Sequence, residues 1–138
     1  MIKTLSILDC KLLNLPKIHA DFGNITTINN LEMIPFELKR VYYLYDVPNS
    51  ADRGAHAHRE LFQLVIAVSG SFDIELFDGF DKVKYTLNQP DQGLLIVPGI
   101  WRDLNDFSAG GVCLVLASHE YQESDYIRDI REYLTWKK

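Results

Sequence analysis

The chain has 138 residues, of which 47% are hydrophobic and 24% charged, and its formal net charge at pH 7 is −5. This length suggests a single domain, residues 1–138, and the scattered Lys and Arg residues form no basic stripe that would suit a nucleic acid. No run approaches the ~18 apolar residues of a membrane-spanning helix, and no signal peptide is visible, which predicts a soluble cytoplasmic protein without a membrane partner.

Most of the chain is typical of short strands separated by turns. The first 30 residues carry the weakest pattern, in which residues 25–30 suggest a strand after a turn at residues 21–24. Apolar or alternating runs predict further strands at residues 38–45, 62–68, 72–77, 83–87, 94–97 and 112–117. Gly, Pro and Asp residues separate these runs. Strands of this length and spacing predict an antiparallel sandwich or barrel of the all-β class.

The C-terminal residues follow a different period. Ser124 is of a type that caps helices. Apolar or aromatic residues then recur at helical spacing, at Tyr126, Ile127, Ile130, Tyr133 and Leu134. We therefore expect one short C-terminal helix packed on the strands, with this stripe in the core or in a dimer contact.

The segment Gly54-Ala55-His56-Ala57-His58 carries the strongest chemical signal. In a strand, residues two apart share a face, so both imidazoles would point the same way, about 7 Å apart along the strand. A lone His is usually structural or exposed, whereas two at this spacing beside a Gly favour a functional role. If their face is the interior, His56 and His58 share one pocket.

The spacing around these histidines resembles the first sequence motif of the cupins, which reads His-x-His, three or four residues, Glu, six residues and Gly. Gln63 stands at the Glu position and Gly70 at the Gly position. The second cupin motif runs from a Gly through a Pro-x-Gly turn to a His and an Asn, and residues 93–105 resemble it. The resemblance implies a cupin fold, a jelly-roll antiparallel β-barrel, here with a short C-terminal helix.

Two of the four metal-ligand positions of metal-binding cupins are changed in this chain. Gln63 offers only a neutral amide oxygen, and Arg102, at the place of the second-motif His, cannot donate a lone pair and repels a cation. The two remaining candidate ligands are too few for a tight transition-metal site. The sequence therefore predicts no metal and leaves His56 and His58 for proton transfer.

At finer grain the chain resembles the nucleotide-sugar 3,4-ketoisomerases, metal-free cupins that act on dTDP-4-keto-6-deoxyglucose. The matching segments are residues 35–43, 53–58, 97–101, 106–108 and 115–118, followed by Tyr121, Asp125, Tyr126 and Ile127. The resemblance implies an enzyme without a cofactor that moves the keto group of a dTDP-linked sugar from C4 to C3. It also implies a homodimer, and a product that a transaminase aminates at C3 for a 3-amino-3,6-dideoxyhexose of a bacterial surface glycan.

The resemblance also assigns roles to residues. It makes His56 the catalytic base and gives His58 the transfer of protons between the sugar oxygens. It implies substrate contacts for Arg53 and Trp101, and a pocket-facing position for Tyr43.

Two arginines are left open between a diphosphate contact and an exposed surface position. Arg102 follows Trp101 where family members commonly have a His, and Arg40 lies in the predicted strand 38–45. The family also often has Asp-x-Arg-Gly near the N-terminus, where this chain has Asp21-Phe22-Gly23 and so lacks a charged contact.

Three other functions fit parts of the pattern. A nucleotide-sugar 3,5-epimerase shares the barrel and the substrate but pairs a His with a Tyr across the sugar ring. A non-catalytic sugar-binding cupin would leave the histidines idle. A metal-dependent cupin oxygenase is disfavoured by Gln63 and Arg102. The configuration at C4 of the product and the identity of the nucleotide stay open at this point.

Overall fold

The structure is a computed structural model that describes residues 4–138. Its strands and helix have the following bounds: β1 Lys11–Asn14, β2 Ile18–Ala20, β3 Gly23–Ile25, β4 Arg40–Leu44, β5 Arg53–His58, β6 Gln63–Ser69, β7 Phe72–Phe77, β8 Lys82–Leu87, β9 Gln92–Ile96, β10 Trp101–Asn105, β11 Val112–Ala117, β12 Tyr126–Ile127 and α1 Ile130–Lys137. Single 3-10 turns at Ile7–Asp9 and Glu123–Asp125 precede β1 and β12. This content confirms the predicted all-β class with one short C-terminal helix.

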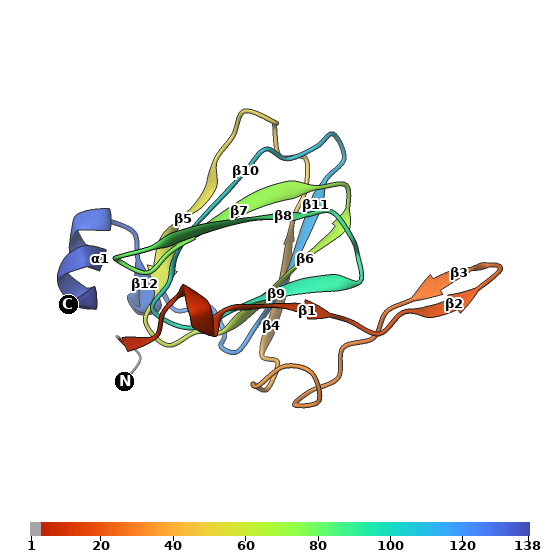
Figure 1. Cartoon of the computed structure of the whole chain (residues 1–138), viewed down its shortest axis with the longest axis horizontal. Coiled ribbons are helices and arrows are strands. Elements are labelled where there is room, and N and C mark those ends of the chain that lie inside the picture. The colour runs from red at the N-terminus through yellow and green to blue at the C-terminus, as the bar shows by residue number, and fades with distance from the viewer. Residues whose placement is uncertain (1–3) are drawn as a thin grey trace.

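Two antiparallel sheets form the body of the molecule (Figure 1). The first has the strand order β1-β9-β6-β11-β4 and the second the order β12-β5-β10-β7-β8, an arrangement consistent with a cupin jelly roll. The main apolar core lies between them, with buried side chains such as Val65 and Val115 from the first sheet and Ile74 and Leu104 from the second. No helix in residues 4–138 has the length and apolar character needed to cross a membrane.

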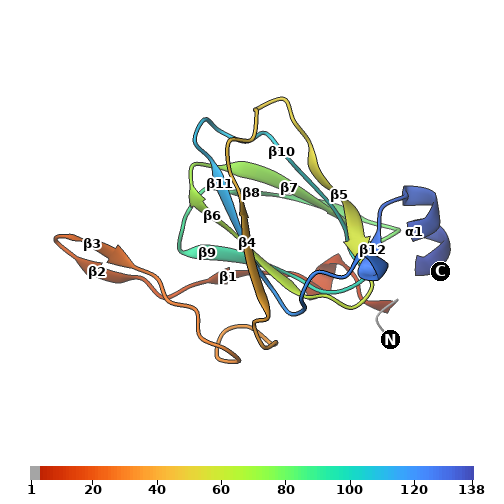
Figure 2. The ribbon, with the colours of Figure 1, turned by 180° about the vertical axis from the view of Figure 1, so that it is seen from behind.

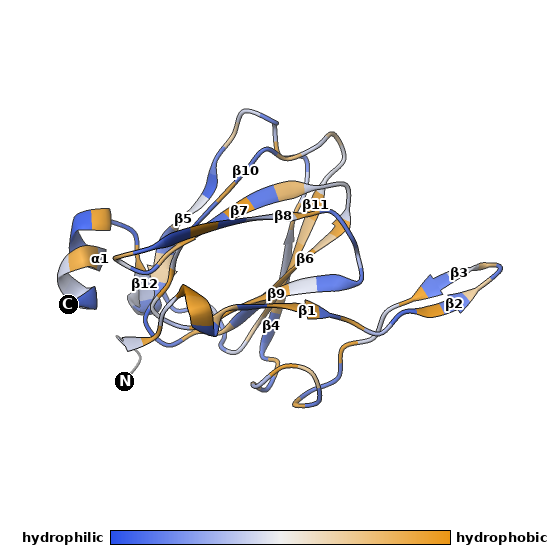
Figure 3. Cartoon of the chain, in the orientation of Figure 1, coloured by the Kyte–Doolittle hydropathy of each residue, from blue (hydrophilic) through white to orange (hydrophobic). Residues whose placement is uncertain are grey.

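Whether apolar and polar residues alternate along a strand depends on whether one or both faces of that strand are covered. Along β7, buried Phe72, Ile74 and Leu76 alternate with outward Asp73 and Glu75, and Figure 3 shows this alternation of apolar and polar residues. On β6 the residues from Leu64 to Val68 are all apolar, because a second apolar cluster covers the outer face of this strand. That cluster joins strand residues to the segment after β3, through Leu15, Ile34, Phe36, Leu64, Ile66, Leu95 and Leu116.

The predicted strands agree with the structure where an apolar or alternating run was strong. The bounds of β7 and β11 match the predictions, and those of β4, β6, β8 and β9 differ by one or two residues at one or both ends. The strand predicted at residues 25–30 is wrong, since β3 ends at Ile25 and pairs with β2 in a hairpin. Strand β10 was not predicted, because Arg102 and Asp103 give it a polar sequence although Arg102 is only 2% exposed.

The C-terminal helix begins later than predicted. Asp129, not Ser124, caps it, its carboxylate accepting the backbone N–H of Arg131 at 2.8 Å. Ahead of the helix, β12 adds to the second sheet, where Tyr126 pairs with His58. Tertiary pairing therefore overrides the helical period of this segment, and α1 buries Tyr133 completely.

A hairpin of β2 and β3 projects away from the body (Figures 1 and 2). All of its strand residues are exposed, including the apolar Ile18 and Ile25, and Phe22 at its turn is fully exposed. A two-stranded hairpin alone is marginally stable in water. This element therefore requires something to pack against.

Candidate functional site

A β-bulge in β5 sets the direction of His56. Gly54 pairs with Asp103 and His56 pairs with Arg102, so that Ala55 is an extra residue between them. The backbone there is left-handed, with φ of +90° at Gly54 and +50° at Ala55. A Cβ on Gly54 would also lie 3.1 Å from the carbonyl oxygen of Arg102. A glycine is therefore required immediately ahead of the His-x-His pair.

The two imidazoles meet edge to face. The Nε2 atoms of His56 and His58 are 3.1 Å apart and the ring centroids 4.8 Å, closer than the spacing expected along a strand. His56 Nδ1 donates to the carbonyl oxygen of Gly54 at 2.8 Å, since a carbonyl only accepts. His56 lines a pocket, whereas His58 is fully buried behind it.

Asp125 orients the second histidine. Its Oδ2 lies 2.9 Å from Nδ1 of His58, and its Oδ1 accepts the backbone N–H of Glu60 at 2.8 Å. Burial alone would raise the pKa of Asp125, but these two hydrogen bonds outweigh it and lower the pKa. The group is therefore a carboxylate that accepts from His58 Nδ1–H, which leaves His58 Nε2 with a lone pair facing His56.

Both histidines are neutral at neutral pH. Burial is the largest cause and, with the charge of Arg102 and the neighbouring ring, lowers the pKa of His56 to about 3. Burial also lowers the pKa of His58 to about 4, against the hydrogen bond to Asp125, which raises it. A neutral imidazole has the lone pair that a general base needs.

The pocket in front of His56 lies between the two sheets and has a volume of about 480 Å³. Four arginines line it, namely Arg40, Arg53, Arg102 and Arg128, against the single carboxylate of Asp52. This excess of positive charge suits an anionic ligand such as a diphosphate.

The structure brings three of the predicted contact residues to this pocket. Arg53 and Arg40 line it, and the guanidinium of Arg40 lies 4.6 Å from the ring centroid of Tyr42. Arg102 also lines it and is only 2% exposed, so the surface alternative for Arg102 is wrong.

Two predicted contact residues lie elsewhere. Tyr43 is 59% exposed on the outer face of β4, because strand alternation turns its neighbour Tyr42 into the pocket. Trp101 is buried in a separate cluster with Tyr133 and Ile127, and its Nε1–H donates to Asp103 at 3.2 Å. The expected pocket positions of Tyr43 and Trp101 are therefore corrected.

The two altered metal-ligand positions are bonded to each other. An Nη1–H of Arg102 donates to Oε1 of Gln63 at 2.5 Å, and Nη2 donates to the carbonyl oxygen of Ile100 at 3.0 Å. The amide nitrogen of Gln63 donates to the hydroxyl of Tyr42 at 3.1 Å. Within residues 4–138 no group of three or more His, Cys, Asp or Glu could hold a metal ion.

Tyr126 and Arg128, just ahead of α1, complete the wall of the pocket in front of His56. The sequence pattern had predicted a helix for this segment. The ring of Tyr126 packs against both imidazoles, with centroid distances of 5.0 Å to His56 and 4.4 Å to His58. Arg128 lies 4.1 Å above the Tyr126 ring and is held by two hydrogen bonds to Glu123, at 2.7 and 2.9 Å. Only the pairing of β12 with β5 reveals these neighbours.

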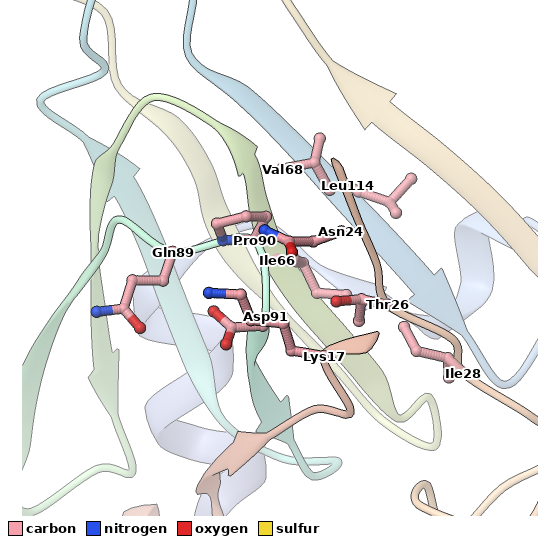
Figure 4. A pocket seen from close by; sticks show the side chains of 10 residues that line it. All are labelled: Lys17, Asn24, Thr26, Ile28, Ile66, Val68, Gln89, Pro90, Asp91 and Leu114. Atoms are coloured by element: carbon pink, nitrogen blue, oxygen red, sulfur yellow. The ribbon is translucent and has the colours of Figure 1, made fainter. Parts of the chain in front are cut away.

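A second groove of about 490 Å³ lies on the outer side of the first sheet, next to the hairpin (Figure 4). Its lining is largely apolar, with Lys17 and Asp91 as the only charged side chains. No histidine lines this groove, and it shares no lining residue with the pocket in front of His56. We attribute the chemistry to the His56 pocket.

The comparisons with known proteins decide the family. The family model described as "FdtA: WxcM-like, C-terminal" matches residues 8–138. The chain belongs to this family. It is 40% identical over 128 residues to the TDP-4-oxo-6-deoxy-alpha-D-glucose-3,4-oxoisomerase of Aneurinibacillus thermoaerophilus, covering 93% of this chain and 90% of that protein.

Solved structures of 3,4-ketoisomerases superpose closely on this chain. The TDP-quinovose 3,4-ketoisomerase WlaRB of Campylobacter jejuni is 46% identical with a TM-score of 0.89, covering 92% of this chain and 98% of that one. A mutant of the 3,4-ketoisomerase QdtA of Thermoanaerobacterium thermosaccharolyticum, in complex with TDP-4-keto-6-deoxyglucose, is 38% identical with a TM-score of 0.92, covering 94% of both chains. The resemblance inferred from the sequence is confirmed.

Proposed function

We propose that this chain is a nucleotide-sugar 3,4-ketoisomerase that converts dTDP-4-keto-6-deoxyglucose to its 3-keto isomer. The observation that carries this function is a neutral His56 at the wall of a pocket lined by four arginines. The substrate is inferred from the names of the relatives. The pocket contains a base and an excess of positive charge that suit a dTDP-linked sugar.

The reaction needs only proton transfers. His56 Nε2 takes the proton from C3, and the C4 carbonyl becomes the oxyanion of an enediol. The O3 proton then moves to O4, C3 becomes the carbonyl carbon, and a proton is added at C4. No redox cofactor is required, because the substrate's own ketone accepts the electron pair.

Arg102 is placed to stabilise the oxyanion. It is buried beside His56, which it faces across the pairing of β5 and β10. Its Nε is a buried donor without an acceptor among the described residues. A substrate oxygen would satisfy this donor, and a charged donor is strongest where the site is dry. Arg40 and Arg53 are then left for the diphosphate.

The function is tested by following the sugar. Purified protein is incubated with dTDP-4-keto-6-deoxyglucose, and the ketone is located by ¹³C NMR. We expect the ketone carbon to move from C4 to C3. Exchange at C3 and C5 without movement of the ketone would identify a 3,5-epimerase instead, and an unchanged spectrum would leave only a binding protein.

Activity is expected without a bound metal ion. The reason is the hydrogen bond between Arg102 and Gln63, which places a positively charged guanidinium at the ligand positions where metal-binding cupins hold a cation. Metal content by mass spectrometry and turnover after dialysis against a chelator check this. Stoichiometric zinc, iron or manganese together with activity that is lost on its removal would contradict it.

We also propose that the chain is a homodimer through the outer face of the first sheet. This face exposes Val41 and Tyr43 beside the apolar groove, and the projecting hairpin adds Ile18 and Phe22. A second copy of the chain would cover the outer face of the first sheet and the hairpin at once, as is typical of a twofold interface. Light scattering after size exclusion should give twice the mass of one chain, and a monomer at micromolar concentration would contradict the proposal.

A further inference from the structure

The connection between β11 and β12 carries a carboxylate that pairs with one of the pocket arginines. Arg128, which lines the pocket in front of His56, donates through Nε to Oε1 of Glu123 at 2.7 Å and through Nη2 to Oε2 at 2.9 Å. This side-on pairing leaves both N–H groups of Nη1 outside the ion pair. Glu123 itself does not line the pocket, so its carboxylate holds the arginine without occupying the site.

The hydroxyl of Tyr121 fixes the same carboxylate. It donates to Oε2 of Glu123 at 2.7 Å. The hydrogen bonds from Arg128 and Tyr121, in this order, lower the pKa of Glu123 to about 2. The bond to the carboxylate is also the largest cause that raises the pKa of Tyr121. At neutral pH, Glu123 is therefore ionised and Tyr121 keeps the proton that it donates.

The ring of Tyr121 contacts a second pocket arginine. The guanidinium of Arg40 lies 5.3 Å from the ring centroid of Tyr121 and 4.6 Å from that of Tyr42, distances at which a cation is attracted to an aromatic ring. Arg40 begins β4 at the edge of the first sheet, whereas Arg128 follows β12 at the edge of the second. The connection from β11 to β12 crosses from one sheet to the other (Figure 2). Tyr121, which lies in this connection, therefore links the two arginines.

These contacts are better suited to ligand binding than to the stability of the fold. The side chains of Arg128 and Glu123 are 52% and 58% exposed, and a single ion pair at such exposure stabilises a protein little. Its bidentate geometry nevertheless fixes the direction of the guanidinium. An arginine that is already ordered loses less conformational entropy when it binds a phosphate.

We propose that Tyr121 and Glu123 are positioning residues that hold Arg40 and Arg128 as a clamp for the diphosphate of the bound nucleotide sugar. This rests on the proposed ketoisomerase function, because the substrate of that reaction carries the diphosphate. The two guanidinium groups of the clamp donate to phosphate oxygens, while the proton transfers take place at the sugar ring. The clamp binds the ground state and the transition state alike, so that it lowers KM and leaves kcat unchanged.

The first test is the variant Glu123→Gln. The neutral amide breaks the bidentate pair, and dTDP should bind about 2- to 10-fold more weakly, since a long side chain must then be ordered on binding. Removal of a negative charge beside the pocket would by itself strengthen the binding of an anion. The direction of the change in Kd, measured by calorimetry with dTDP, therefore separates the two effects. KM for dTDP-4-keto-6-deoxyglucose should rise by the same factor, with kcat unchanged.

A double-mutant cycle tests whether Glu123 acts through Arg128. Arg128→Gln should weaken dTDP binding by about 10- to 100-fold, the usual effect of losing a charged hydrogen bond. In this background Glu123→Gln should cause no further weakening. Tyr121→Phe keeps every charge and the ring beside Arg40 but loses the hydroxyl. It should weaken dTDP binding in the same direction as Glu123→Gln, and by less.

The matched control is Glu132→Gln, which removes the carboxylate of an exposed ion pair with Arg59 outside the pocket lining and should behave as wild type. Equal or tighter binding of dTDP by Glu123→Gln, additive losses in the double variant, or a fall in kcat with unchanged KM would overturn the proposal. Failure of the wild-type protein to convert the keto sugar would instead overturn the ketoisomerase function. The calorimetry with dTDP would still decide the role of the clamp.

Discussion

Replacing His56 with Asn is expected to lower kcat by about 10²–10⁴-fold, the usual contribution of a general base. His56 is the only imidazole in the pocket lining, and its neutral ring has no substitute there. Affinity for dTDP should change little, because the arginines that surround the pocket remain. Steady-state turnover and calorimetry with dTDP measure the two quantities separately.

The control for this change is His119→Asn. His119 is exposed, bonds to Ser118 at 2.7 Å and does not line the pocket, so its variant should turn over as wild type. If His56→Asn kept near-full activity, the base would lie elsewhere. Loss of dTDP binding in the same variant would point to a folding defect instead.

Replacing Asp125 with Asn is expected to lower kcat by about 10²-fold or more, since an imidazole held in the wrong tautomer loses its function as a base. The backbone N–H of Glu60 requires an acceptor, so the Asn oxygen would face Glu60 and the Asn nitrogen would face His58. His58 would then carry its proton on Nε2 and donate it to His56 Nε2. The lone pair that should take the C3 proton would be occupied.

Nitrogen-15 NMR of the histidine rings gives a readout that a simple packing defect would not produce. In the wild type we expect His58 to be protonated at Nδ1, and in Asp125→Asn at Nε2. Asp129→Asn is the matched control, because Asn also caps helices and Asp129 contacts neither histidine. Full activity of Asp125→Asn, or a wild-type His58 that is protonated only at Nε2, would contradict the assigned role of Asp125.

The local pattern of the sequence determined the strands and part of the site. Residues 72–77 alternate between apolar and polar, which is typical of a strand with one covered face. Residues 112–117 are apolar throughout, which is typical of a strand with both faces covered. Both strands can be predicted from such local patterns without information on distant segments. The His-x-His spacing after Gly54 identified His56, and the change to Gln63 and Arg102 signalled that the metal-ligand set is incomplete. Chemistry that depends on neighbours in the chain was therefore visible.

The tertiary structure decided everything that depends on pairing between distant segments. Asp125 lies 67 residues from His58, and only β12 joining β5 brings them together. Strand register, set by sheet pairing, turned Tyr42 inward rather than Tyr43, and the packing of β10 buried Arg102. A single sequence carries residue types and spacings, but the face that each strand presents depends on partners far along the chain. His58 therefore matched the expected motif yet lies behind His56 instead of at the pocket wall.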